Sequence, residues 1–274
     1  MGAPAISKRE GDMGLPIFHV DAFTDKPYAG NPAAVCILPE ARNARWMQNV
    51  AREMNLPETA FLLKGQEGFN LRWFTPTVEV DLCGHATLAG AHVLWEAGYL
   101  KPDQQALFST RSGLLTAERK RKWIELNFPA EPESPAPVPT GLATALGVTP
   151  RYVGKNRFDY LAEVDSEETV RNLKPDFALL GEIPARGIIV TSRAATRGYD
   201  FVSRFFAPRA GITEDPVTGS AHCCLGPFWR PRLGKTEFVA YQASSRGGVV
   251  RVRLSGNRVH LAGQAVTVLR GELL

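Results

Sequence analysis

Two stretches of the sequence place a glycine among small and polar residues at a point where a helix is expected to begin. One is Thr213–Cys224 (TEDPVTGSAHCC), and the other is Leu82–Trp95 (LCGHATLAGAHVLW). In the first of these, the free backbone N–H groups of Thr218, Gly219 and Ser220 would point toward one spot. The first N–H groups of a helix lack partners and the helix dipole is positive there, so such a start binds anions such as carboxylates.

The two stretches belong to a repeated pattern. Each copy runs through aromatic residues, a proline, acidic residues, a glycine, small residues, an apolar helix and a tryptophan. The copies begin at Trp73–Pro76 and at Phe205–Pro208. Such self-similarity predicts two related halves. Two helix starts that face each other across an interdomain cleft would hold an anionic ligand from both sides.

Four residues are candidate proton carriers. Glu58 begins an apolar strand, where a carboxylate can take up and release a proton near neutral pH. His85 lies at the first helix start, as the counterpart of Ser220 beside the shared glycine, and could carry a proton or donate to a substrate carboxylate. Asp215 and its neighbour Glu214 precede the second helix start and could act as acid or base, or cap the helix. An ordinary surface glutamate and a packed histidine are the plainer interpretations.

Cys83 stands just before the first helix start, where a thiol has a depressed pKa and could serve as a thiolate base. Racemases that work without cofactors use two such thiols, one on each face of the substrate carbon. The second copy has Pro216-Val217 before Thr218-Gly219, and its cysteines, Cys223 and Cys224, lie inside the helix. We therefore prefer Cys83 as a buried small hydrophobic residue, and a Cys83-dependent amino-acid racemase or epimerase stays an alternative.

Other kinds of chemistry lack their motifs. The sequence has no Gly-rich nucleotide fingerprint, no P-loop and no metal-binding helix, and nothing near Ser220 marks a general base for hydrolysis. The four cysteines are too few for a disulfide scaffold and lack zinc spacing, which favours a reducing, cytoplasmic setting. The 32 Lys and Arg exceed the 28 Asp and Glu by only four, too few for a nucleic-acid surface. No stretch is long and apolar enough to span a membrane.

Short strands around two apolar helices must position these residues. Alternating or apolar segments predict strands at 15–23, 33–38, 58–63, 69–74, 106–110, 113–119 and 123–128, with a similar series in the second half. A helix at 87–97 is apolar nearly all round and must be covered on all sides. A second such helix should start near Gly219 and kink or end at Gly226-Pro227, since an internal proline costs roughly 3 kcal/mol. The pattern predicts curved, barrel-like sheets wrapped around helices.

The chain resembles the PhzF-like proteins, the relatives of the phenazine-biosynthesis protein PhzF, which share the diaminopimelate epimerase fold. The resemblance runs from about Pro16 to the C-terminus. The matching stretches are, in order, Val20–Phe23, Gly30–Val35, Glu58–Phe61, Arg72–Pro76, Cys83–Thr87, Phe205–Pro208, Glu214–Ser220 and Gln242–Gly248.

The resemblance implies an α+β fold of two similar domains, each a barrel of strands around a central helix, with the site in the cleft between them. The last strand should return to the first domain. The expected division is a disordered extension at 1–14, a first domain at 15–128 plus 264–274, a proline-rich linker at 129–139, and a second domain at 140–263. The family uses no cofactor and commonly forms homodimers, and PhzF itself isomerises trans-2,3-dihydro-3-hydroxyanthranilate.

We therefore predict a cytoplasmic, cofactor-independent isomerase or epimerase that moves a proton between carbons of a small carboxylic acid, with no metal, nucleic acid or membrane as partner. The resemblance implies that Glu58 is the acid/base, and that His85 and Asp215 assist it. Together with the helix starts, it makes the expected substrate-binding residues Gly84, Thr218, Gly219 and Ser220. A non-catalytic small-molecule binding or regulatory protein is a further alternative.

Overall fold

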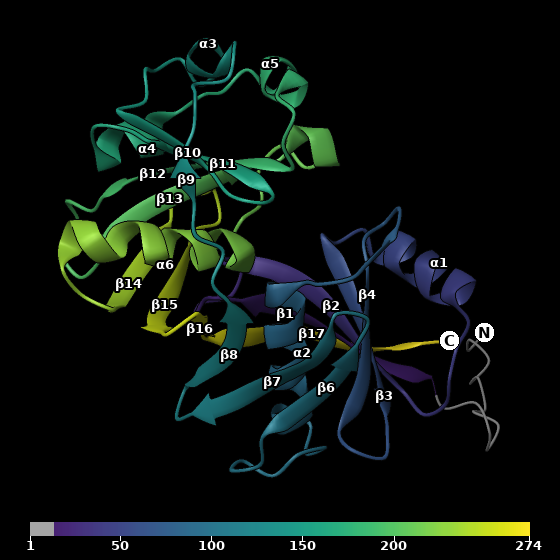
Figure 1. Cartoon of the computed structure of the whole chain (residues 1–274). Helices are drawn as coiled ribbons and strands as arrows, with labels where there is room; N and C mark the ends of the chain where they lie inside the picture. Colours follow the sequence, from purple (N-terminus) through teal and green to yellow (C-terminus); the bar gives the residue numbers. More distant parts are fainter. Residues whose placement is uncertain (1–13) are drawn as a thin grey trace, which may run out of the picture.

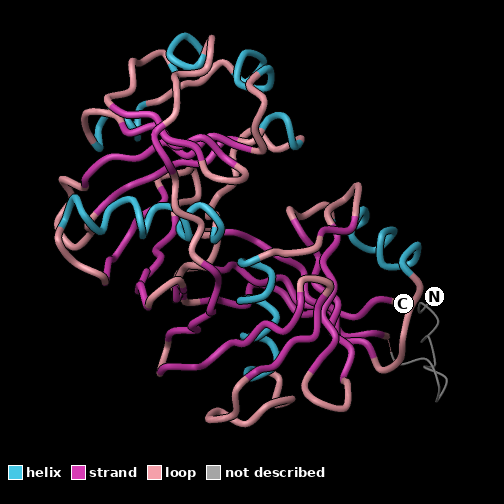
Figure 2. Tube along the Cα trace, viewed as in Figure 1, coloured by secondary structure: helices cyan, strands magenta, loops and turns pink. Residues whose placement is uncertain are grey.

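The chain forms two lobes in a computed structural model that describes residues 14–274 (Figure 1). The disordered extension predicted at 1–14 lies outside the described residues, apart from Gly14. Strands make up most of both lobes, and helices are fewer (Figure 2). No helix in the described part is long and apolar enough to cross a membrane. The predicted α+β class is therefore observed.

The first lobe, at the lower right of Figure 1, contains both described ends of the chain. Its strands are β1 (Leu15–Ala22), β2 (Asn31–Leu38), β3 (Glu58–Lys64), β4 (Phe69–Phe74), β5 (Glu79–Val80), β6 (Ala106–Thr110), β7 (Gly113–Lys120), β8 (Trp123–Pro129) and β17 (Ala265–Leu273). Its helices are α1 (Ala44–Met54) and α2 (Gly84–Glu96). The C-terminal strand β17 runs antiparallel to β1 along its whole length, from the pair Leu15–Leu273 to the pair Ala22–Ala265.

The second lobe holds the middle of the chain. Its strands are β9 (Ser134–Pro135), β10 (Tyr152–Lys155), β11 (Asp159–Glu163), β12 (Gly187–Arg193), β13 (Phe201–Phe206), β14 (Glu237–Gln242), β15 (Gly248–Ser255) and β16 (Arg258–Gly263). Its helices are α3 (Leu142–Leu146), α4 (Glu167–Asn172), α5 (Phe177–Glu182), a 3-10 turn η1 (Pro208–Ala210) and α6 (Gly219–Leu233). Because β8 pairs with β16, the sheets of the two lobes join into one.

Helices α2 and α6 supply the centre of the core, as predicted. Ten of the 13 residues of α2 are buried, which only a helix of small and apolar residues tolerates. Small size matters where the sheet comes close, since a Cβ added to Gly90 would lie 3.3 Å from a methyl group of Leu62. Nine of the 15 residues of α6 are likewise buried, Cys224 and Trp229 among them.

A kink or an early end was expected in α6 near Gly226-Pro227, and the early end is wrong, because the helix continues to Leu233. Proline lacks an N–H group, so Pro227 frees the carbonyl of Cys223 one turn earlier. That carbonyl accepts instead from the backbone N–H of Glu131, at 3.1 Å. Glu131 belongs to the proline-rich segment predicted as a linker. The carbonyl that Pro227 leaves free therefore binds this segment to α6.

The repeat seen in the sequence is also a repeat of topology. Strands β1 to β4 pair as antiparallel, parallel and antiparallel neighbours, and β10 to β13 pair in the same way. In each lobe an arginine of the last strand of this series, β4 or β13, donates two hydrogen bonds of 2.7 and 2.8 Å to a glutamate. The pairs are Arg72 with Glu79 and Arg204 with Glu214. Glu214 is therefore a structural partner and not a free acid.

Candidate active site

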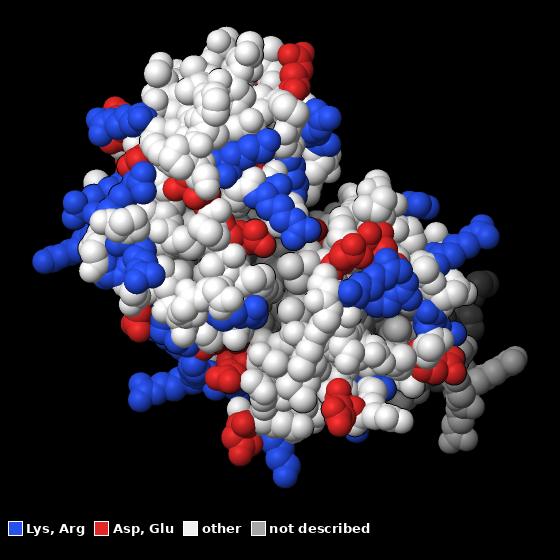
Figure 3. Space-filling model, viewed as in Figure 1, with Lys and Arg blue, Asp and Glu red and all other residues white. Residues whose placement is uncertain are grey.

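The N-terminal ends of α2 and α6 meet between the lobes. A Cβ added to Gly84 would lie 3.7 Å from the Cα of Gly219, so the two glycines face each other in van der Waals contact distance. Cys83 and Thr218 precede them in extended backbone, and neither side chain caps its helix. The first N–H groups of both helices are therefore free of side-chain caps. Figure 3 shows the surface hollowed between the lobes, with charged side chains of both signs at the rim.

Glu58 and His85 come together at this junction. Glu58 Oε2 lies 3.1 Å from His85 Nε2, and the two side chains are only 12% and 7% exposed. The atoms are close enough for an ion pair, but neither makes a hydrogen bond of good geometry with another described residue. Burial opposes a charge on His85, whereas Cys83 and Glu58 favour it, and the balance raises the pKa of His85 well above its usual value.

Asn31 connects His85 to Asp215, and the analysis of the sequence missed it. Its Nδ2 lies 2.7 Å from Asp215 Oδ1, 2.9 Å from the carbonyl of Val217 and 3.2 Å from His85 Nδ1. The amide has two hydrogens for these three acceptors, and the shorter distances give them to Asp215 and Val217. Asn31 stands in a turn-rich stretch, where asparagine is ordinary, so only its neighbours in space identify it.

Asp215 is also held by Thr218 and by Gln242, and the analysis of the sequence gave Gln242 no role. Thr218 Oγ1 donates to Asp215 Oδ2 at 2.5 Å. Gln242 accepts from the N–H of Thr218 at 2.9 Å and donates to the carbonyl of Asp215 at 2.8 Å. Burial raises the pKa of Asp215, although the nearby His85 acts in the opposite direction. Asp215 therefore holds its proton more strongly than a surface aspartate.

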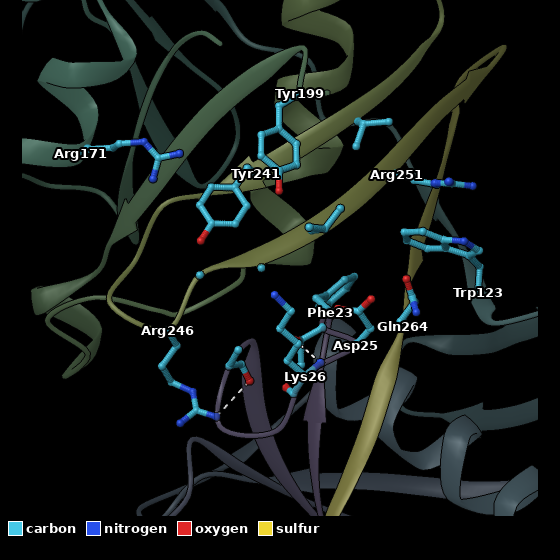
Figure 4. A pocket seen from close by; sticks show the side chains of 16 residues that line it. Phe23, Asp25, Lys26, Trp123, Arg171, Tyr199, Tyr241, Arg246, Arg251 and Gln264 are labelled. Carbon is cyan, nitrogen blue, oxygen red and sulfur yellow. Dashed lines mark hydrogen bonds between the residues drawn. The ribbon is translucent and has the colours of Figure 1, made fainter. Parts of the chain in front are cut away.

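The loop that delivers Asn31 is fixed from behind by the second lobe. Arg246 donates to Asp21 at 2.7 Å and to the carbonyls of Gly30 and Ala29 at 2.8 and 3.0 Å. This arginine borders a cavity of about 550 Å³ in which Tyr199 stacks on a second tyrosine (Figure 4). None of the predicted site residues lines that cavity. The hydrogen bonds of Arg246 therefore hold the loop before Asn31 in place, and Arg246 is not itself part of the candidate site.

Ser220 meets a further residue that the sequence did not suggest. Its Oγ accepts from Arg186 Nη2 at 3.0 Å. Arg186 also donates from Nε to Asp159 Oδ1 at 2.9 Å and from Nη2 to Asp159 Oδ2. The Asp159 carboxylate is fully buried, while the side chain of Arg186 is 39% exposed. The second helix start thus carries a fixed cation beside its free N–H groups.

Cys83 is buried, as preferred from the sequence, but it lies within the site. Its Sγ is 3.5 Å from His85 Nδ1. Burial raises the pKa of Cys83, and the charge of Glu58 adds to this, so the depressed pKa of an activated thiol is not observed. Its structural counterpart is Thr218, which precedes the second helix as Cys83 precedes the first. The position equivalent to Cys83 in the second lobe therefore carries a hydroxyl group in place of a thiol.

His222 has a structural role. It lies on a buried face of α6, with Nδ1 2.8 Å from the carbonyl of Thr218, and burial lowers its pKa to about 4.

Glu58, Cys83 and His85 each offer a ligand atom within 4.8 Å of the others, so these three could hold a metal ion. Glu and Cys and His are ligands that zinc accepts. A search for zinc spacing along the sequence misses this set because Glu58 comes from strand β3, whereas Cys83 and His85 lie at the start of α2.

The chain is similar to known proteins over nearly its whole length. The model of the family described as "Phenazine biosynthesis-like protein" (PhzC-PhzF) matches residues 20–271. An uncharacterized isomerase of Halalkalibacterium halodurans is 58% identical over 263 residues, which cover 96% of this chain and 99% of the relative.

Solved structures agree. The crystal structure of a PhzF-family phenazine biosynthesis protein of Enterococcus faecalis matches with a TM-score of 0.91 and 41% identity, covering 96% of this chain and 100% of that one. A predicted epimerase of Pseudomonas aeruginosa, at 22% identity, shares the fold with a TM-score of 0.72 over 95% of this chain and 99% of its own. The predicted epimerase-like fold is confirmed, and the chain belongs to the phenazine biosynthesis-like, PhzC-PhzF family.

Proposed function

We propose that this protein is a cofactor-independent isomerase that moves a proton between two carbons of a small carboxylic acid. The isomerase name of the Halalkalibacterium relative supports the reaction class. The observation that carries the proposal is the Glu58–His85 pair. Its Oε2 and Nε2 atoms lie 3.1 Å apart, buried and without a well-formed hydrogen bond, beside two uncapped helix starts.

The steps follow from this geometry. Glu58 takes a proton from one carbon, and the electron pair of the broken C–H bond moves into the conjugated system of the substrate. The protonated Glu58 then gives the proton to a second carbon, so no oxidant, reductant or other reactant is consumed. His85 keeps its charge because its pKa is raised, and it places a positive group 3.1 Å from Glu58. The free N–H groups at Gly219 and Ser220 hold the carboxylate.

The position of the second lobe that is equivalent to Glu58 carries no acidic side chain, which favours proton transfer on one face of the substrate. Glu58 begins β3, and Gly187 begins β12 at the equivalent position of the repeat. A Cβ added to Gly187 would lie 2.3 Å from the ring of Phe205, so a side chain there would require the ring to move. A single carboxylate can return a proton to the face from which it came. Inversion at one carbon would need a second acid on the opposite face, where Thr218 stands in place of a thiol.

Solvent deuterium incorporation tests the proposal. Wild type and Glu58→Gln would be incubated in deuterium oxide with a panel of cyclic dienes, amino acids and hydroxy acids, and carbon-bound deuterium followed by NMR. We expect incorporation that falls by roughly 100-fold or more in Glu58→Gln, since general acid–base groups contribute about that much. Exchange that survives unchanged in Glu58→Gln would show that this residue is not the base.

A Cys83-dependent racemase or epimerase remains the second candidate, because the sulfur lies 3.5 Å from His85 Nδ1. It predicts the reverse pattern in the same assay. Exchange at the α-carbon of an amino acid would be lost in Cys83→Ser and after thiol alkylation, and it would survive in Glu58→Gln. A binding protein without turnover would show no exchange with any variant while still binding a carboxylate.

A further inference from the structure

The repeat allows the two halves of the site to be compared position by position. In the first lobe Glu58 pairs with Ala33 and the next residue, Thr59, pairs with Phe74. In the second lobe Gly187 pairs with Asp159 and the next residue pairs with Phe206. Gly187 therefore occupies the place of Glu58, and the residue just before it is Arg186.

Each lobe thus directs one charged side chain at the first turn of its central helix. In the first lobe Glu58 reaches His85, which follows the helix glycine Gly84. In the second lobe Arg186 reaches Ser220, which follows Gly219. The guanidinium of Arg186 is steadied by aromatic rings on which it lies, 5.0 Å from the centre of Phe158 and 5.6 Å from that of Phe205. The first half-site carries a carboxyl group and the second carries a permanent cation that only donates hydrogen bonds.

The hydrogen bonds of Arg186 fix the direction of the Ser220 hydroxyl. A guanidinium only donates, so Ser220 Oγ must accept from Nη2. The hydrogen of the Ser220 hydroxyl is then free to point elsewhere. The buried carboxylate of Asp159 occupies the Nε–Nη2 edge of the guanidinium. Nη1 has no hydrogen-bond partner within residues 14–274, so its two hydrogens are also free.

We propose that Arg186 is a positioning and specificity residue that makes the Ser220 hydroxyl a donor and, with Nη1, selects a carboxylate over a neutral group at the start of α6. This rests on the proposed function, in which the cleft binds a small carboxylic acid. It adds an orientation, with the anionic end toward the second lobe and the reacting carbons under Glu58. The substrate class is then a small monocarboxylate.

Binding of benzoate, with neutral benzamide as the matched probe, tests this without knowing the substrate. Amide chemical shifts of Gly219 and Ser220 would be followed by ¹H–¹⁵N NMR titration. We expect benzoate to bind wild type and the control Arg157→Gln alike, since Arg157 is a nearby exposed cation that does not contact Ser220. In Arg186→Gln the affinity for benzoate should fall about tenfold or more, while benzamide binding stays the same. Arg186→Lys keeps the charge without the fork and should restore only part of the preference.

Arg186→Gln leaves the buried Asp159 unpaired and could unfold the lobe, so the double variant Asp159→Asn/Arg186→Gln is measured as well. Loss of the benzoate preference in this folded variant supports the inference. An unchanged preference in either folded variant would overturn the role of Arg186 and leave the proposed function standing. If wild type bound neither benzoate nor other monocarboxylates at Gly219 and Ser220, the carboxylate site itself would be refuted, and the role of Arg186 with it.

Discussion

Asn31 offers the sharpest test of the polar group that joins the lobes. Asn31→Asp keeps the shape of the side chain but replaces the donor Nδ2 with a carboxylate oxygen. That oxygen would stand 2.7 Å from Asp215 Oδ1 and 2.9 Å from the carbonyl of Val217. Two hydrogen bonds are lost, one of them to an acidic group, and two like charges meet in a buried place.

The expected cost follows from these contacts. A hydrogen bond to a charged group contributes about 1.5–3 kcal/mol and one to a neutral carbonyl about 1 kcal/mol. The free energy of unfolding should therefore fall by about 2.5–4 kcal/mol at pH 8. At low pH one proton shared between the two carboxyls of residues 31 and 215 relieves the repulsion. The folded form of the variant binds protons more tightly than the unfolded chain, so its stability falls as the pH rises.

Urea unfolding followed by tryptophan fluorescence measures both effects. The loss of stability in Asn31→Asp should be about 2.5–4 kcal/mol near pH 8 and clearly smaller near pH 4.5. Asn70→Asp is the matched control, because Asn70 is exposed on β4 of the same lobe and should change stability little. A cost for Asn31→Asp that is as small as the control, or that does not depend on pH, would refute the contacts described for Asn31.

Three further predictions concern single positions. Although burial opposes it, hydrogen bonds from Thr196 and its neighbours lower the pKa of Glu167 to about 2. Glu167→Gln should therefore destabilise the protein by up to about 3 kcal/mol above pH 5, and the difference should vanish as the pH falls toward 2; a constant difference in urea unfolding would contradict this. Cys83→Ser should keep deuterium exchange within about tenfold of wild type, and complete loss would favour the thiol mechanism. Gly187→Ala should lower the melting temperature through its clash with Phe205, at a cost of about 1–3 kcal/mol, and unchanged melting would show that the ring moves freely.

The sequence located the helix starts well because their signals are local. A glycine followed by small and apolar residues marks where α2 and α6 begin, and the structure has them at Gly84 and Gly219. The repeat of aromatic, proline, acid and glycine predicted two related lobes, and the pairing of the strands repeats accordingly. His85 and Glu58, separated by 27 residues, were linked only through the family resemblance, and the structure brings them to 3.1 Å.

The residues that the sequence did not reveal depend on contacts between distant parts of the chain. Asn31 resembles any turn residue until Asp215, from the other lobe, lies beside it. Gln242 and Arg186 are ordinary strand-end residues whose partners are fixed by the register of the sheet. The expected end of α6 at Pro227 failed for the same reason, since the freed carbonyl found its partner in a segment nearly 100 residues away. Tertiary contacts of this kind override local propensity.

The return of β17 to β1 has a consequence for the order in which the chain folds. A ribosome makes β1 and its neighbour β2 first, but the other edge of β1 has no partner until the last residues, up to Leu273, have been synthesised. Contacts between such distant segments form slowly, and an open strand edge can pair with other chains in the meantime. The second lobe is complete at Gly263, before β17 exists. The sheet of the first lobe therefore cannot be completed until the whole chain has been synthesised.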